Sequence, residues 1–243
     1  MTPETSFNSG AIAPFECLKL GWAAIKDRYW LFLGVTLVAT LLGGAVPIVL
    51  IGPMMCGLYM CLLARMRGEE IEFGMLFKGF DYFVQGLVAA AIQTGPVLVL
   101  VIAGDVIFLA FTFAVVPRGH QEPPPPIFWL GLTVFVIFAV VVSMAIHAMF
   151  VFAYPLIVDR KLSGLDAIKT SFRAAMKNLG GILGLILINV GLGIVGVLLC
   201  FVGVYFVLPL SFAAYAAAYR QVFPDRPLNF SSSPPPPPAS WAA

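Results

Sequence analysis

The stretch YPLIVDRKLSGLDAIKTSFRAAMKN (154–178) is a polar helical pattern that joins two long apolar runs. Neither 123–158 nor 178–219 contains an Asp, Glu, Lys or Arg residue. Within and just after the quoted stretch, apolar side chains recur at steps of three or four residues, at Leu165, Ile168, Phe172, Met176 and Leu179. This period predicts an amphipathic helix, and Ser163 with Asp166 fits its N-terminal cap. A basic amphipathic helix between two apolar runs is expected to lie in the membrane interface.

The composition of the whole chain is that of an integral membrane protein. Hydrophobic residues make up 60% of it and charged residues 11%, whereas soluble domains carry about 25% charged residues. A length of 243 residues suits one membrane domain. The net charge of +2 and the lack of a basic run argue against nucleic acid as a partner.

The number of spans follows from the uncharged runs and from the positions of the basic residues. The runs 29–64 and 178–219 are each long enough for one kinked helix or for a hairpin of two, because a spanning helix needs about 20 apolar residues. Two spans in each run place every Lys and Arg except Arg118 on one side, which the positive-inside rule makes cytoplasmic. We therefore predict six spans, with both termini cytoplasmic, at about 29–46, 49–67, 83–116, 127–157, 179–198 and 202–221. An eight-span arrangement also satisfies the charges and ranks second.

Proline and glycine set the expected shape of the two middle spans. Residues 132–154 contain neither, so a turn is not expected there and we predict one long span over 123–158. The span 83–116 is expected to bend at Gly95-Pro96, because proline lacks a backbone donor.

Each predicted hairpin of spans is preceded by an amphipathic segment, at about 14–28, 72–82 and 163–177. The first and third segments also continue alike, since 23–30 matches 174–181. The predicted fold is an all-α polytopic transmembrane helical bundle: about six spans in three hairpins, each preceded by a cytoplasmic interfacial amphipathic helix. We predict one membrane domain over 14–226, between a flexible N-terminus (1–13) and a disordered Pro-rich cytoplasmic tail (227–243).

Two motifs carry a family resemblance. They are GPMMCGLYMCLLARMRGEEIEFGMLFKGF (52–80) and PLIVDRKLSGLDAIKTSFRAAMKN (155–178). Both are similar to the pattern of a broad group of uncharacterised bacterial integral membrane proteins. That group is related to the membrane domain that accompanies some glycerophosphodiester phosphodiesterases. The resemblance covers about 15–225 and implies the fold and an inner-membrane location. It implies little about activity, and the soluble phosphodiesterase domain has no counterpart in these residues.

The sequence offers no recognisable catalytic, cofactor or metal site. His120 and His147 lack metal-ligand spacing, and the four cysteines lack the spacing of a zinc site. Walker, zinc-protease and nucleophile-elbow motifs are missing from the sequence. We therefore predict a protein without enzymatic activity and without a cofactor or metal.

Five polar side chains within the predicted spans form a candidate intramembrane site: Gln93, Asp105, Ser143, His147 and Asn189. A carboxylate at the centre of a span costs about 2.5–3.5 kcal/mol. Asp105 therefore either faces the bundle or lies near the outer headgroups, and counting along its helix favours the headgroups. Asn189, close to several glycines, also fits a role in helix packing.

Six basic residues are candidate contacts for lipid headgroups: Arg65, Arg67, Lys161, Lys169, Arg173 and Lys177. The expected partners are membrane lipids, together with a protein partner or a second copy of the chain. The predicted function is that of a membrane scaffold, an accessory subunit or a lipid-interacting module. The alternative is a permease for a small solute or ion, with its site between the internal repeats. Convergence of the five intramembrane polar residues on one path would favour the permease.

Overall fold

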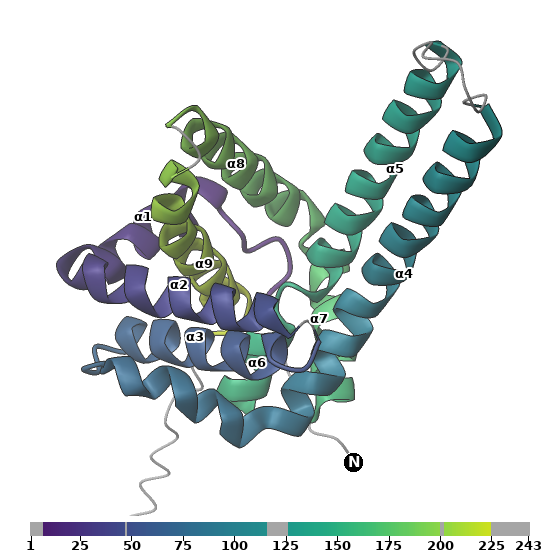
Figure 1. Cartoon of the computed structure of the whole chain (residues 1–243). Coiled ribbons are helices and arrows are strands. Elements are labelled where there is room, and N and C mark those ends of the chain that lie inside the picture. Colours follow the sequence, from purple (N-terminus) through teal and green to yellow (C-terminus); the bar gives the residue numbers. More distant parts are fainter. Residues whose placement is uncertain (1–6, 47, 116–125, 200–201, 225–243) are drawn as a thin grey trace, which may run out of the picture.

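The structure is a computed structural model that describes residues 7–46, 48–115, 126–199 and 202–224. Arg118, expected on the outer side, and the predicted Pro-rich tail (227–243) fall outside the described residues. Helices make up nearly all of the described chain (Figure 1). They are α1 (Pro14–Ile25), η1 (Lys26–Arg28), α2 (Tyr29–Ala45), α3 (Ile51–Met66), η2 (Phe73–Tyr82), α4 (Phe83–Val115), α5 (Pro126–Phe150), α6 (Ala153–Arg160), α7 (Gly164–Lys177), α8 (Leu179–Leu198) and α9 (Val202–Val222). The all-α prediction is confirmed.

In the described part of the chain, five helical stretches are long and apolar enough to cross a membrane. They are Pro14–Ala45, Phe73–Phe113, Pro126–Arg160, Leu179–Leu198 and Val202–Val222. The other predicted span is the shorter apolar helix α3, whose 16 residues measure about 24 Å. Most of α3 is buried against α2, η2, α4 and α6. The chain is therefore a multi-pass membrane protein with a short apolar helix at the centre of its fold.

Each of the three hairpins follows a short helix, as the repeat in the sequence predicted. The short helix α1 precedes α2 and α3, η2 precedes α4 and α5, and α7 precedes α8 and α9. The segment η2 differs in detail, because it is a 3-10 helix over its whole length. Apolar residues spaced by three or four positions fit both an α-helix and a 3-10 helix. The apolar pattern therefore predicted a helix here but did not distinguish between the two types.

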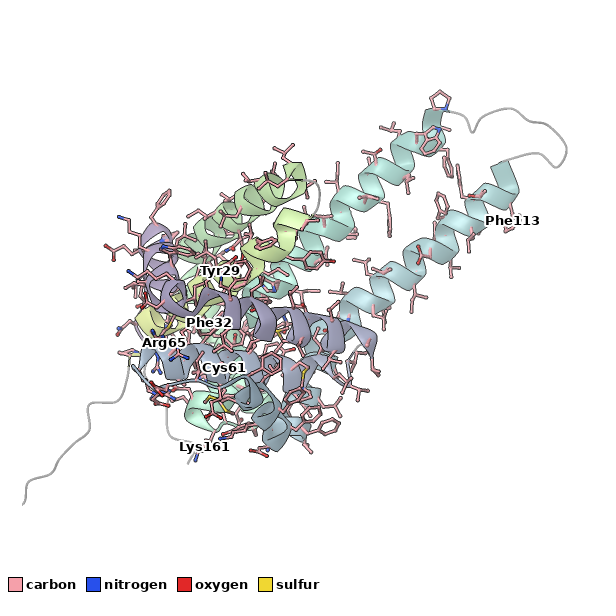
Figure 2. The ribbon with its side chains drawn as sticks, turned by 60° about the vertical axis from the view of Figure 1, so that its left-hand side comes forward. Tyr29, Phe32, Cys61, Arg65, Phe113 and Lys161 are labelled. Atoms are coloured by element: carbon pink, nitrogen blue, oxygen red, sulfur yellow. The ribbon has the colours of Figure 1, made fainter. Side chains whose placement is uncertain are left out.

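The hairpin of α4 and α5 extends away from the other long helices (Figure 1). Figure 2 shows Phe113 at the far end of this hairpin, remote from Tyr29 and Phe32. Along it the large apolar side chains are exposed, with Val99 at 68% and Ile127 at 67%. An apolar surface of this kind suits the hydrocarbon of a bilayer. A bilayer also requires that backbone polar groups be hydrogen-bonded within the protein, and helices meet this requirement.

The run 123–158, predicted as one long span, is not one unbroken helix. Helix α5 ends at Phe150 and helix α6 begins at Ala153. Pro155 explains the break, because in a continuous helix its ring would clash with the carbonyl of Val151, four residues earlier. The two helices together still make one candidate span, so the correction concerns its continuity.

Ser171 on α7 stabilises this break. Its hydroxyl donates to the Met149 carbonyl at 3.0 Å and accepts from the Phe152 amide at 3.1 Å. One buried side chain thus satisfies a donor and an acceptor that an interrupted helix leaves without internal partners. Helix α4, in contrast, runs through Pro96 without interruption.

The backbones of α3 and η2 lie in very close contact at Gly57 and Gly79. A Cβ atom built on Gly57 would collide with the backbone carbonyl of Leu76, and one built on Gly79 would collide with the backbone of Pro53 and Gly57. Leu76 itself is fully buried beneath α3. The two glycines therefore let the 3-10 helix lie directly against the central helix.

Residues within the segment 7–13 form hydrogen bonds with the helical bundle. The Asn8 amide donates to the Val222 carbonyl at 2.9 Å. The buried Asn178 side chain accepts from the Ala11 amide at 3.1 Å and donates to the Asn8 carbonyl at 3.0 Å. The described part of the predicted N-terminal segment, residues 7–13, is therefore hydrogen-bonded to Asn178 and to the end of α9.

Candidate functional site

Helix α7 begins with the predicted cap and packs on the protein through small side chains. The Ser163 hydroxyl accepts from the Asp166 amide at 3.3 Å and donates to the Asp166 carboxylate at 2.7 Å. The buried face consists of Gly164, Ala167, Ile168, Thr170, Ser171, Ala174 and Ala175. Small residues allow the helix to lie close to its neighbours, and its larger side chains point elsewhere.

The outward face of α7 combines apolar and basic side chains. Leu165, Phe172 and Met176 are 53%, 41% and 49% exposed. They lie on one stripe of the helix, because they are spaced by seven and four residues. Lys169 and Arg173 are exposed beside this stripe. Ile168 differs from its prediction, since it is turned toward the protein with 7% exposure.

A cavity of about 520 Å³ lies where α7 meets the end of α5. Its walls combine the apolar side chains of Phe150, Ile168 and Phe172 with the cations Lys169 and Arg173. Two of the six predicted headgroup contacts are thus brought together over an apolar floor. An anionic group with a hydrocarbon attached would find complementary surface for both of its parts here.

The other four predicted headgroup contacts are placed differently. Lys161 is exposed at the left-handed turn that ends α6. The Lys177 ammonium lies 5.5 Å from the centre of the Phe7 ring, a cation–π distance that ties it to the N-terminal segment. Arg65 and Arg67 take part in ion pairs at the C-terminal end of α3. The six residues therefore do not form one surface.

Asp159, which the sequence reasoning did not single out, pairs with Arg67 and with two further arginines. Its carboxylate lies 3.5 Å from Arg67, 3.4 Å from Arg160 and 3.5 Å from Arg220, and it accepts the Tyr219 hydroxyl at 2.7 Å. The Asp159 side chain is 12% exposed. Ends of α3, α6 and α9 therefore meet at one shared carboxylate.

Arg67 also reaches Glu69, which follows it at the end of α3. Its Nε donates to the Glu69 carboxylate at 2.6 Å. This hydrogen bond from a cation holds the pKa of the exposed Glu69 carboxyl below its usual value.

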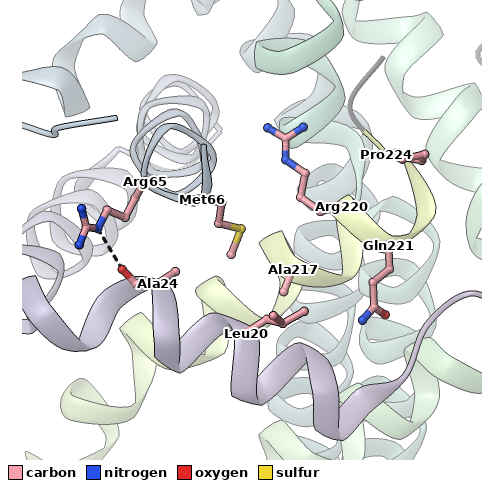
Figure 3. Close-up of a pocket in the computed structure, with 8 residues that line it drawn as sticks. All are labelled: Leu20, Ala24, Arg65, Met66, Ala217, Arg220, Gln221 and Pro224. Carbon is pink, nitrogen blue, oxygen red and sulfur yellow. Dashed lines mark hydrogen bonds between the residues drawn. The ribbon is translucent and has the colours of Figure 1, made fainter. Parts of the chain in front are cut away.

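A second cavity, of about 510 Å³, lies between α1 and the ends of α3 and α9 (Figure 3). The Arg65 Nε donates to the Ala24 carbonyl at 3.2 Å, and its guanidinium pairs with Asp27 at 3.5 Å. Gln221 accepts from the Ala13 amide at 3.0 Å. These polar side chains hold α1 against the neighbouring helices, so we assign this cavity a structural role and not a ligand-binding one.

Three of the five predicted intramembrane polar residues line one cavity. It measures about 350 Å³ and receives Ser143 and His147 from α5 and Asn189 from α8. Tyr215 on α9 is a fourth polar member that the sequence did not indicate. The His147 and Tyr215 rings meet edge to face, with centroids 5.5 Å apart. Convergence of α5, α8 and α9 thus creates a polar site among apolar helices.

Asp105 and Gln93 do not belong to this cavity. Asp105 is exposed on the distal half of α4 and forms no ion pair with any described residue. Gln93, earlier on the same helix, has a buried side-chain oxygen without a hydrogen-bond partner in the described part of the chain. The structure therefore gives no single path that connects all five predicted residues.

No group of three or more His, Cys, Asp or Glu side chains among the described residues could hold a metal ion. No family model matches the chain, and neither the curated proteins nor the solved structures contain a match to it.

Proposed function

We propose that this protein is a lipid-interacting membrane module without enzymatic activity, and that it binds anionic phospholipid headgroups at α7. The observation that carries the proposal is the cavity where Lys169 and Arg173 stand over Phe150, Ile168 and Phe172. Cations near a bilayer surface attract anionic headgroups, and each contributes about 1 kcal/mol. The apolar wall offers contact to the first part of an acyl chain.

The exposed stripe of Leu165, Phe172 and Met176 supports the same proposal. In an aqueous setting this stripe would be costly, whereas at a membrane interface it can enter the acyl region while the neighbouring cations stay with the headgroups. We place this end of the molecule at the cytoplasmic surface of a bacterial-type inner membrane, because the basic residues gather there in the sequence. The two motifs at 52–80 and 155–178 support membership of the uncharacterised family that they resemble.

A Lys169→Gln/Arg173→Gln double variant is expected to bind phosphatidylglycerol about 30-fold more weakly, since two cations contribute roughly 2 kcal/mol. Native mass spectrometry of the protein in neutral detergent would count the phosphatidylglycerol retained against phosphatidylcholine of the same chains. The charge-matched control is Lys19→Gln/Lys26→Gln, which removes two exposed cations from α1 and η1. Equal losses in both double variants would show a general charge effect and refute the α7 site.

The second candidate function is that of a permease. The convergence of Ser143, His147 and Asn189 with Tyr215 favours it. The exposed position of Asp105 counts against an ion pathway, because it leaves the cavity without an acidic residue. Flux of uncharged solutes into proteoliposomes would distinguish the two functions, since a headgroup-binding module would show none.

A further inference from the structure

The polar cavity between α5, α8 and α9 contains a hydrogen-bond acceptor that the protein leaves unused. The Asn189 Nδ2 donates to the Leu185 carbonyl at 2.8 Å. This bond fixes the orientation of the amide, because a flipped amide would direct its oxygen at the carbonyl oxygen. The Asn189 Oδ1 is buried and has no partner among the described residues.

An unpaired buried acceptor is unfavourable, and within a span no bulk water is at hand to satisfy it. No described residue donates to the Asn189 Oδ1, although the Tyr215 hydroxyl lies close to the same amide, so a ligand that brings a donor would relieve this cost. Ser143 adds a hydroxyl four residues before His147 on α5, which places both on the same face of that helix. The site thus offers acceptors and hydroxyl groups within a small volume.

The cavity carries no formal charge, because none of its lining residues is Asp, Glu, Lys or Arg. Its remaining walls are the apolar side chains Met144, Ile186 and Val190. A charged ligand would lose its hydration on entering this cavity, and no opposite charge there would compensate for that loss. The chemistry therefore selects an uncharged ligand with at least one hydroxyl or amide donor.

The cavity opens toward the apolar outer surface of the helices. His147 and Val190 line it and are exposed. Next to it on α8, Leu187 is 70% exposed. A volume of about 350 Å³ lies at the lower end of the range for small-ligand sites, roughly 300–1,000 Å³. The cavity can hold a headgroup while acyl chains stay outside, along the apolar surface.

We propose that this cavity binds the hydroxyl headgroup of an uncharged lipid of the diacylglycerol class, which reaches it sideways from the bilayer. The free hydroxyl of the lipid donates to the Asn189 Oδ1. Met144, Ile186 and Val190 contact the glycerol carbons, and the acyl chains lie against the exposed side chains of α5 and α8. This site is separate from the headgroup site proposed at α7, and each can be tested without the other.

The test uses a diacylglycerol with a fluorescent acyl chain, titrated by anisotropy against the full-length protein in neutral detergent micelles. An Asn189→Leu variant is expected to bind it about tenfold more weakly or worse, because the acceptor is lost. Its thermal stability should be unchanged or higher, since an unpaired buried acceptor has been removed. Unchanged affinity in a folded Asn189→Leu variant would overturn the proposal.

Matched controls separate this site from its alternatives. The same lipid with its hydroxyl methylated should bind the unmodified protein about tenfold more weakly, and equal binding would refute recognition through the hydroxyl. Lys169→Gln/Arg173→Gln should leave diacylglycerol binding intact, while Asn189→Leu should leave the phosphatidylglycerol preference intact. Free glycerol that competes as strongly as the lipid would refute a lipid ligand and favour a solute. As a second variant, Val190→Phe should narrow the mouth of the cavity and weaken binding without touching the acceptor.

Discussion

A Gly57→Ala variant is expected to lose about 3 kcal/mol of stability, at the upper end of the cost of overpacking. The added Cβ would collide with the backbone carbonyl of Leu76. A backbone group cannot rotate away as a flexible side chain can, so α3 and η2 would have to separate. For a chain of this size the loss corresponds to a fall of roughly 6–12 °C in melting temperature, measured by the thermal unfolding of the purified protein in detergent.

Gly191→Ala is the matched control for this variant. Gly191 also lies in an apolar helix, but among the described atoms none comes within 4 Å of a Cβ built on it. Alanine favours helix over glycine by about 0.5–1 kcal/mol, so this variant should melt at the same temperature or slightly higher. If the two variants melted alike, the close packing of α3 on η2 would not contribute to stability as the structure indicates.

The positions of the helices were predictable because local patterns determine them. Uncharged runs marked the long helices, and the period of apolar residues marked α1, η2 and α7 before each hairpin. The end of α5 could also have been predicted from the sequence. Pro155 disfavours a continuous helix through Val151, and attention to glycine and proline over 132–154 alone missed it.

The candidate site was only partly predictable, because it depends on contacts between distant segments. Ser143 and His147 share a helix face, so their proximity follows from spacing alone. Asn189 joins them only because α8 packs beside α5, and Tyr215 only because α9 packs on α8 and brings its ring to His147. Asp105 was expected near the outer headgroups from its distance along α4, and its exposed side chain lies outside the cavity.

The ion pairs at Asp159 could likewise not be predicted from the sequence alone. The sequence marks Arg65 and Arg67 as charges at the end of a span, but nothing local indicates the carboxylate that Arg67 meets. Asp159 becomes its partner because α6 packs beside α3. The short helix α6 exists as a separate element because of the break before it, so the position of this carboxylate depends on Pro155 and Ser171 as well.

An Asp159→Asn variant is expected to lose about 3 kcal/mol, which is the lower end of the cost of removing one member of a buried ion pair. The substitution keeps the shape of the side chain but removes the charge that Arg67, Arg160 and Arg220 share. These guanidinium groups would then repel one another at a site where Asp159 had been only 12% exposed. The melting temperature should fall by roughly 6–12 °C relative to the unmodified chain.

Salt and a matched variant identify the cause of this loss. At 1 M salt the screening length falls to about 3 Å, so added salt should restore part of the stability if repulsion among the arginines is responsible. Asp27→Asn removes the same charge from a side chain that is 63% exposed and that pairs, among the described residues, with Arg65. An exposed pair of this kind contributes about 0–1 kcal/mol, so this control should melt close to the unmodified protein. Equal melting of the two variants, at low salt, would mean that Asp159 does not join the helix ends through its charge.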